Sequence, residues 1–219
     1  MRLSNFQTNL NCVRFPLYIA LKLNQSEEII MNYKKITVIM IALFITSGAA
    51  FAQTVKKEVA DFISSVYSPR AFNTIPVSDA QIAEILKSGI QAPSARNAQP
   101  WYFTVIKTNE LVKKVISAST DGNVLFVISG IDDAQREAAV ALDCGLATEN
   151  IFLAAQALGL GSRIYTNPIN AINSGMKEEL GIPAGYKAVA VVRVGNMDPV
   201  DATSSASTRK EAKDLVNYK

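Results

Sequence analysis

The feature that most constrains the fold is a long apolar segment between Asp133 and Leu158. An ordinary surface helix has its apolar side chains on one face. In this segment they recur on more than one face. They are Ala138, Ala139, Ala141, Leu142, Leu146, Ala147, Ile151, Phe152, Ala154, Ala155 and Leu158. A helix of this kind is buried by neighbouring elements or by a second subunit. The segment therefore predicts a central helix that ends at Gly159-Leu160-Gly161.

Shorter elements alternate with this helix along the chain. Strands are predicted over residues 101–106, 124–129, 163–165 and 188–194, and helices near residues 55–66, 110–117 and 173–180. Another helix follows Ser78, which forms a capping box with Gln81. Its buried stripe is expected to contain Ile82, Ile85, Leu86 and Ile90. Helices that alternate with few strands indicate an α+β or three-layer α/β class.

Residues 31–52 have the pattern of a secretory signal peptide. A short positive region ends at Lys35, an apolar run covers Ile36 to Ser47, and Ala50 and Ala52 are small residues where a signal peptidase reads. The apolar run is shorter than the ~20 residues of a membrane-spanning helix. We expect cleavage near Ala52, export to the periplasm and no membrane attachment of the mature form.

The sequence before the signal peptide carries no structural pattern. Residues 1–30 show no periodicity, so we interpret them as an extension from a mis-assigned start, with translation beginning at Met31. The mature domain is then residues 53–219. Of the chain's 22 basic and 19 acidic residues, five basic and two acidic ones precede residue 53, which leaves 17 of each. A neutral domain offers no basic field for nucleic acid or an anionic membrane.

The composition limits the chemistry that side chains can perform. The chain has no histidine, which excludes Ser-His-Asp and Cys-His pairs, imidazole bases and metal sites built on His. Cys12 and Cys144 form no CxxC pair, and no metal site is expected. Reactivity must come from carboxylates, Lys, Tyr and Ser, or from a cofactor that needs only binding and orientation.

A small polar loop, Pro93-Ser94-Ala95-Arg96-Asn97-Ala98-Gln99-Pro100-Trp101, joins a predicted helix to a predicted strand. Such a loop can bring its backbone close to a flat polar ligand. Taken singly, Trp101 is a core anchor, and Ser94 and Asn97 are turn formers. Gly159 and Gly161 do not open a dinucleotide loop, because they follow a helix and Ile164 stands in place of the third glycine.

Two segments in this order resemble the nitroreductase-like flavoproteins, which bind FMN. The loop is similar to the family's Pro-Ser-x-x-Asn-x-Gln-Pro-Trp signature, and residues 143–162 are similar to its long helix with a Leu-Gly-Leu-Gly-Ser end. Gly181-Ile182-Pro183-Ala184-Gly185-Tyr186 also resembles the family. The resemblance implies a three-layer α/β/α fold with a mixed sheet, flanking helices and a long central helix. It also implies an intertwined homodimer with two FMN molecules at the interface.

The resemblance assigns site residues position by position. Tyr67, Ser68 and Arg70 would contact the ribityl chain and pyrimidine edge of FMN, with Arg70 stabilising negative charge on the reduced ring. From the partner subunit, Pro93, Ser94, Ala95 and Asn97 would reach the same FMN. The backbone at Tyr165 and Thr166 would lie near N5, and Arg209 would pair with the phosphate. No side chain is assigned a catalytic role, because flavin N5 carries the chemistry.

Two positions depart from the family pattern. Val66 stands where the family usually has a phosphate-binding Arg, and Ser207 stands where a Lys often accompanies the C-terminal Arg. Each lost cation should weaken FMN binding by ~1–3 kcal/mol, the scale of a charged hydrogen bond, and Lys210 is a candidate for compensation. The region between Lys114 and Val124 is also shorter than usual, so substrate specificity does not transfer.

The sequence thus predicts an exported, FMN-dependent oxidoreductase. By a ping-pong mechanism it would pass hydride or electrons from NAD(P)H, or another donor, to an electron-poor nitroaromatic or quinone. One alternative is a flavin- or ligand-binding protein of the same fold without turnover, which Val66 and Ser207 motivate. A second is a flavin-dependent dehydrogenase or oxidase that needs no nicotinamide.

Overall fold

The computed structural model describes residues 57–198 and 208–219. The expected extension 1–30, the signal peptide 31–52, the cleavage point near Ala52 and Ser207 lie outside the described residues. The chain divides into two units, Met1–Asp61 and Phe62–Lys219, and the structural account below concerns the second. A helix covers residues 57–65 of the described chain, which agrees with the helix expected over residues 55–66.

Four strands form one sheet in the described part of the chain. They are β1 (Trp101–Ile106), β2 (Val124–Ile131), β3 (Gly161–Tyr165) and β4 (Tyr186–Gly195). Their order across the sheet is β1-β2-β4-β3, and each pair of neighbours is antiparallel. The expectation of a mixed sheet is therefore wrong for the described strands, because every one of them returns alongside a neighbour that runs in the opposite direction.

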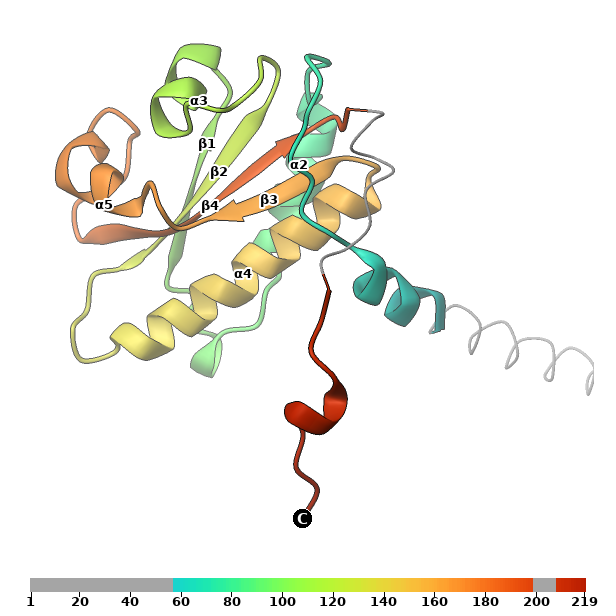
Figure 1. The fold of residues 1–219 in the computed structure, drawn as a ribbon. Coiled ribbons are helices and arrows are strands. Elements are labelled where there is room, and N and C mark those ends of the chain that lie inside the picture. The colour runs from blue at the N-terminus through green and yellow to red at the C-terminus, as the bar shows by residue number, and fades with distance from the viewer. Residues whose placement is uncertain (1–56, 199–207) are drawn as a thin grey trace, which may run out of the picture. The chain divides into compact units, whose positions relative to one another are not determined.

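Helices cover both faces of this sheet, which gives the three layers expected of an α+β fold (Figure 1). One face packs against α2 (Asp79–Ile90) and α4 (Glu137–Ala157), and the other against α3 (Asn109–Val115) and the turns from α5 (Ile169–Ala171) into η2 (Ile172–Met176). Side chains along β2 alternate between the two cores, with Phe126 and Ile128 in the first and Leu125 and Val127 in the second. The central strands are thus buried on both faces.

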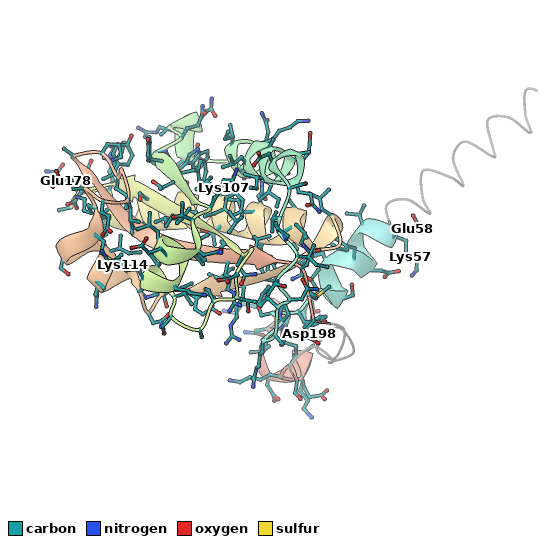
Figure 2. All side chains as sticks on the ribbon, turned by 90° about the horizontal axis from the view of Figure 1, so that it is seen from above. Lys57, Glu58, Lys107, Lys114, Glu178 and Asp198 are labelled. Atoms are coloured by element: carbon teal, nitrogen blue, oxygen red, sulfur yellow. The ribbon has the colours of Figure 1, made fainter. Side chains whose placement is uncertain are left out.

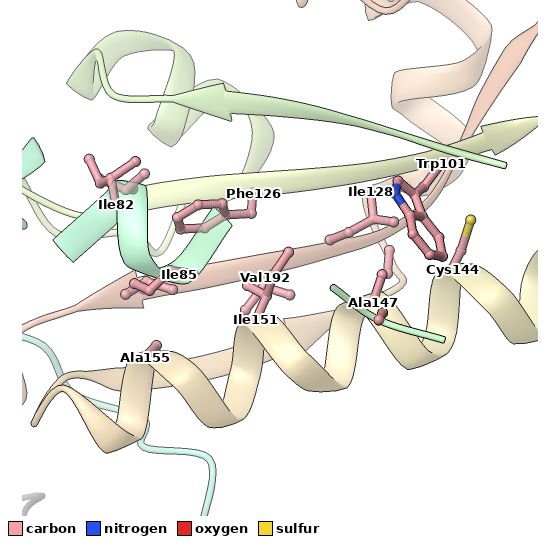
Figure 3. Packing of buried hydrophobic residues seen from close by; sticks show 14 of the residues in the cluster. Ile82, Ile85, Trp101, Phe126, Ile128, Cys144, Ala147, Ile151, Ala155 and Val192 are labelled. Atoms are coloured by element: carbon pink, nitrogen blue, oxygen red, sulfur yellow. The ribbon is translucent and has the colours of Figure 1, made fainter. Parts of the chain in front are cut away.

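Helix α4 is the central helix that its apolar composition predicts. Cys144, Ala147, Ile151 and Ala155 point toward the sheet and belong to the core beneath it, together with Phe126 and Val192 (Figure 3). The helix has the length and apolar composition of a membrane span, but this buried face makes it the core helix of the domain. Trp101 belongs to the same core and is 9% exposed, as expected of an anchor.

The ends of the helices follow local hydrogen bonds. Ser78 caps α2, its side chain and that of Gln81 forming the expected capping box. Ile82 and Ile85 are buried as predicted, whereas the prediction for Ile90 is wrong: it is 49% exposed in the last turn of α2. Ile90 is the last residue of α2, which ends at the C-cap Gln91.

Two helix boundaries differ from prediction because side chains capture backbone groups. Asp133 accepts the N–H groups of Gln135 and Arg136, so a turn precedes α4 and the helix begins at Glu137. Asn173 bonds both the N–H and the carbonyl oxygen of Ala188 on β4. Asn173 lies in the five-residue π-helical turn Ile172–Met176, and turns follow this turn, so the regular helix expected over residues 173–180 is not observed.

Several ion pairs lie on the exposed surface. Lys107 pairs with Asp79, and Lys114 pairs with Glu179 at 2.6 Å. Figure 2 labels the two lysines. Each contributes about 0–1 kcal/mol, because water and salt screen exposed charges. Residues 208–219, which include the short turn η4 (Ala212–Asp214), are exposed throughout.

The close approach of α4 to β2 depends on Gly130. A Cβ atom added there would lie 2.5 Å from Val140 Cγ1 and 3.0 Å from Cys144 Sγ. We expect Gly130→Ala to lower the free energy of unfolding by about 1–3 kcal/mol, the cost of overpacking a filled core. Urea denaturation followed by Trp101 fluorescence measures the change. Gly175→Ala, whose Cβ would meet no atom within 4 Å, is the matched control, and equal stability of the two variants would contradict the packing argument.

Candidate functional site

The loop between α2 and β1 has an unusual backbone. Arg96, Asn97 and Gln99 have φ values of 55°, 54° and 47°, in the left-handed region that residues other than glycine rarely enter. Asn tolerates this region better than Arg or Gln. The flanking Ala92 and Pro100 are buried, while Pro93 and residues 95–99 are exposed. The loop therefore presents a strained, polar backbone on a fixed base.

Short-range and long-range hydrogen bonds hold this loop. The Ser94 hydroxyl accepts the N–H of Gln99 at 3.0 Å, and the Ser94 carbonyl accepts the N–H of Asn97 at 3.0 Å. The tip is tied to α4, because the N–H of Ala95 donates to Asp143 Oδ1 at 3.0 Å. Strained backbone of this kind persists only where surrounding contacts over-determine it, and it clusters at ligand sites.

A second predicted segment, residues 67–70, is anchored at the other end of α4. Gln156 Nε2 donates to the Tyr67 carbonyl oxygen at 2.6 Å and lies 3.2 Å from Ser162 Oγ. The Ser162 hydroxyl in turn donates to the Phe152 carbonyl at 2.8 Å. Between these anchors Pro69 is buried, and Ser68 and Arg70 on either side of it are exposed. One helix end thus fixes the segment that carries three predicted flavin contacts, Tyr67, Ser68 and Arg70.

Gly161, which has no side chain, lets residues 67–70 lie directly against the sheet. A Cβ atom on Gly161 would lie 2.7 Å from Pro69 Cγ and 2.7 Å from Met197 Cγ. Phe72 forms an isolated antiparallel bridge with Met197, and the Asn73 side chain donates to the Met197 carbonyl at 2.9 Å. The predicted helix-ending glycines therefore have a second use, because Gly161 also brings β3 against the Arg70 segment.

Tyr165 and Thr166 lie where β3 ends, with Thr166 exposed and Tyr165 half-buried. The Arg163 guanidinium lies 5.4 Å from the centre of the Tyr165 ring. Ser162, four residues before Thr166, carries the anchor of the Tyr67 segment, so that anchor and the predicted N5 position are about 13 Å apart along β3. The strand joins two parts of the predicted site.

A buried arginine supports the same region. Arg193 is 2% exposed, and its guanidinium donates to Asn123 Oδ1 at 2.7 Å and to the Ala118 carbonyl at 3.1 Å. It also stacks 4.1 Å from the centre of the Phe72 ring. Burial lowers the pKa of Arg193, and a side-chain hydrogen bond with Tyr165 acts in the opposite direction. Arg193 therefore connects the strand of Tyr165 with the segment that follows Arg70.

The predicted residues fall into two groups within one chain. Tyr67, Ser68 and Arg70 are held near Gln156, whereas Ser94 and Asn97 are held near Asp143. The two anchors are 13 residues apart on α4, a rise of about 20 Å. The structure thus brings each group together internally and keeps the two groups apart.

Arg209 and Val66 lie outside these two groups. Arg209 lies in the exposed segment 208–219, so its pairing with a phosphate stays a prediction. Val66 is half-buried just after the helix of residues 57–65, where its N–H donates to the Phe62 carbonyl. Among the described residues no group of three or more His, Cys, Asp or Glu could hold a metal ion.

Sequence reasoning missed Asp143, Gln156 and Arg193 as support for the site. Asp143 and Gln156 are two of the few polar residues in a mostly apolar helical segment, and their polarity was the available signal. Arg193 is likewise the one charge in the run Ala188 to Val194, which otherwise consists of valine and alanine. A polar side chain in a buried run must find hydrogen-bond partners. For Asp143 and Gln156 these are the two site segments, and for Arg193 they are the residues between α3 and β2.

Comparison with known proteins identifies the family. The profile described as the Nitroreductase family matches residues 63–124 and 119–196. The chain belongs to the nitroreductase family. The match covers both site segments and all four strands of this nitroreductase-family protein.

Relatives of known sequence and structure agree with this family. A protein of Archaeoglobus fulgidus, whose name provisionally gives it as an NADH dehydrogenase/NAD(P)H nitroreductase, is 36% identical over 58% of this chain and 79% of its own length. An NADPH-flavin oxidoreductase of Vibrio harveyi is 25% identical, over 60% of this chain and 62% of its own. A nitroreductase structure from Desulfitobacterium hafniense with bound FMN is 25% identical, with a TM-score of 0.62, over 74% of this chain and 98% of its own.

Cys144, next to the anchor Asp143, is fully buried in this nitroreductase-family fold. Burial and, secondarily, the charge of Asp143 raise the pKa of its thiol from 9.0 to about 11. The thiol is therefore protonated near neutral pH and unsuited to act as a nucleophile.

The raised pKa of Cys144 predicts a pH-dependent stability. Between pH 9.0 and about 11 the folded thiol keeps its proton while the unfolded thiol loses it, so the free energy of unfolding must fall as pH rises. The expected loss over this window is about 2–3 kcal/mol. Urea denaturation of the wild type and of Cys144→Ala at a series of pH values isolates the effect. Parallel pH dependences in the two proteins would show that Cys144 does not contribute.

Proposed function

We propose that this chain is an FMN-dependent oxidoreductase that passes reducing equivalents from NAD(P)H to an electron-poor small molecule. The observation that carries the proposal is the Ser94 loop, residues 93–101. It is strained at three non-glycine residues, mostly exposed, hydrogen-bonded to a core helix, and within the part of the chain that matches the Nitroreductase family. FMN is present in the Desulfitobacterium hafniense relative, and its presence here is part of the proposal.

The chemistry of the exposed groups fits FMN. Ser68 and Asn97 offer hydrogen-bond donors and acceptors to the polar edge of a flat ring, and Arg70 offers a positive charge. Each extends from a segment that a hydrogen bond ties to α4, so its position is largely set before a ligand arrives. Bound FMN would supply reversible hydride chemistry, which no amino-acid side chain provides.

The chain's own residues would bind FMN, orient its ring and adjust its reduction potential. Arg70 would hold its charge beside the pyrimidine edge of the ring, where negative charge is best stabilised by a nearby cation. Tyr67 and Ser68 would contact the ribityl chain, and the backbone of Tyr165 and Thr166 would border the reactive edge. Arg209 would pair with the phosphate, helped by Lys210, since Val66 provides no cation.

The separation of the two groups supports a site built from two chains. If one protomer supplies Tyr67, Ser68 and Arg70, its Ser94 loop lies about 20 Å away along α4 and serves a second ligand. Leu142 and Leu146 of α4 are 64% and 37% exposed, next to the exposed Ala138, Ala141 and Gly145. We propose that this apolar face packs against a second copy in an intertwined homodimer with two flavin sites.

One site would serve donor and acceptor in turn. Because both must reach the same exposed edge near Thr166, the donor leaves before the acceptor binds, and the kinetics are ping-pong. A quinone or nitroaromatic suits such a site, because it needs no side-chain acid or base. We also propose that the chain is exported after cleavage near Ala52, which leaves the physiological donor to be found outside the cytoplasm.

The proposed function is tested on the purified protein with added FMN. We expect a yellow complex with flavin absorbance that NADH or NADPH bleaches and a quinone or nitroaromatic restores, with parallel-line ping-pong kinetics in the steady state. A protein that ignores FMN would favour a ligand-binding module. A flavin complex that neither nucleotide bleaches in stopped flow would favour the dehydrogenase or oxidase alternative.

Variants of the two proposed cationic contacts give the controls for this test. Arg70→Ala should lower the flavin potential, and Arg209→Ala should weaken FMN binding about 10- to 100-fold, as expected for a charged hydrogen bond. Lys107→Ala, which removes a cation paired with Asp79 at the surface, should change neither. An unaltered potential would mean that Arg70 points to solvent, and unaltered affinity would remove Arg209 from the phosphate site.

The homodimer predicts a specific sensitivity of α4. Leu142→Glu places a charge on the face proposed to be buried between copies, so sedimentation should show dissociation to monomers together with loss of FMN. Ile75→Glu changes a residue that is 59% exposed outside α4 and should leave the association unchanged. A dimer that survives Leu142→Glu would place the interface elsewhere.

The export proposal has its own measurement. In the native host, with the signal peptidase inhibited, the precursor should begin at Met31, and the mature protein should begin near Gln53. A precursor that begins at Met1 would refute the interpretation of residues 1–30. A mature protein that retains residues 31–52 would refute cleavage.

A further inference from the structure

We propose that Asp143 is a positioning residue: its buried carboxylate, acting through the Ser94–Ala95 peptide group, holds Asn97 in the conformation that presents its side chain to FMN. The inference rests on the proposed function, because it concerns the same site. Asp143 would contact neither flavin nor substrate and would act through the loop.

Asp143 is poorly compensated for a buried charge. It is 4% exposed, and its single hydrogen bond within the part of the chain that the structure describes is the one from Ala95. A carboxylate withdrawn from water usually gathers several donors, because burial otherwise disfavours its charge. Because the Asp143 carboxylate has this one donor, its main contribution is to hold the Ala95 N–H group. In the described chain this is also the only hydrogen bond from residues 94–99 to another element.

The peptide group between Ser94 and Ala95 transmits the effect. Its N–H donates to Asp143, and its carbonyl oxygen accepts the N–H of Asn97 at 3.0 Å. Donation to an anion polarises a peptide group and makes its carbonyl a stronger acceptor. The hydrogen bond strengthened in this way closes the turn that contains Arg96 and Asn97, with φ values of 55° and 54°.

The turn needs this support because Arg96 and Asn97 do not favour the left-handed backbone conformation that they adopt in it. Arg96 has no intrinsic preference for the left-handed region, and Asn97 enters it only with local hydrogen bonds. The Asn97 side chain is exposed and is contacted within the loop by Gln99 Nε2, 3.2 Å from Asn97 Oδ1. If the turn relaxed, the Asn97 side chain would leave its place and FMN would lose a partner.

The test compares Asp143→Ala and Asp143→Asn with Thr148→Val in the full chain. We expect Asp143→Ala to weaken FMN binding about 10- to 100-fold, the range for one charge-assisted hydrogen bond. Asp143→Asn keeps an acceptor of the same shape without the charge, so it should restore part of the affinity and leave a smaller, measurable loss. Thr148→Val removes a buried hydrogen bond to the Cys144 carbonyl on the same helix and should leave FMN affinity unchanged. Equal loss in the Ala and Val variants would reduce Asp143 to a merely structural role.

A double-mutant cycle identifies the route of the effect. If Asp143 acts through Asn97, then Asp143→Ala should weaken FMN binding little further once Asn97→Ala is present, because the two changes remove one interaction. Fully additive effects would overturn the proposal. If Asp143→Ala does not fold, the same cycle is run with Asp143→Asn.

Amide hydrogen exchange separates this inference from the proposed function. Without any flavin, the Ala95 and Asn97 amides should exchange faster in Asp143→Ala than in the wild type, while the β2 amides stay protected. Unchanged exchange would overturn the positioning role, whatever FMN does. A wild type that binds no FMN would overturn the proposed function, and the exchange rates would still decide whether Asp143 holds the loop.

Discussion

The close packing of α4 against the centre of the sheet is the constraint on which the rest of the structure depends. Small side chains at Cys144, Ala147 and Ala155, together with Gly130 on β2, bring the helix axis near the strands. Close-packed cores transmit displacement because they contain few voids. A shift of α4 would therefore move everything attached to it, which includes both site segments.

Helix α4 sets the distance between the two site segments, because it carries one polar anchor for each of them. Asp143 holds the Ser94 loop and Gln156 holds the Tyr67 segment, so the distance between the segments is a helical rise. Loops that bind ligands are normally the mobile parts of a fold. Here hydrogen bonds from the core restrain them, and the backbone strain at Arg96 and Asn97 is offset by contacts with that core.

Much of this arrangement could be predicted from residue patterns, because those patterns report local preferences. Alternation and β-branching located β1, β2 and β4, and the pair Ser78 and Gln81 marked the start of α2. The turn at Asp133 and the π-helical turn at Asn173 were missed, because each depends on which backbone group a side chain reaches in three dimensions. The supporting roles of Gln156 and Arg193 were missed for the same reason. The site residues taken from the family resemblance stay predictions, and the fold places only those of residues 67–70 and 93–97 in two groups.

Arg193 constrains how this protein can change over evolutionary time. Its guanidinium satisfies the Ala118 carbonyl, Asn123 and Thr120 at once, and it faces the Phe72 ring. Lysine has neither the planar fork nor the number of donors to replace it. Arg193 and the connection between α3 and β2 therefore depend on each other. Homologues that lack the arginine should have a different structure in this connection.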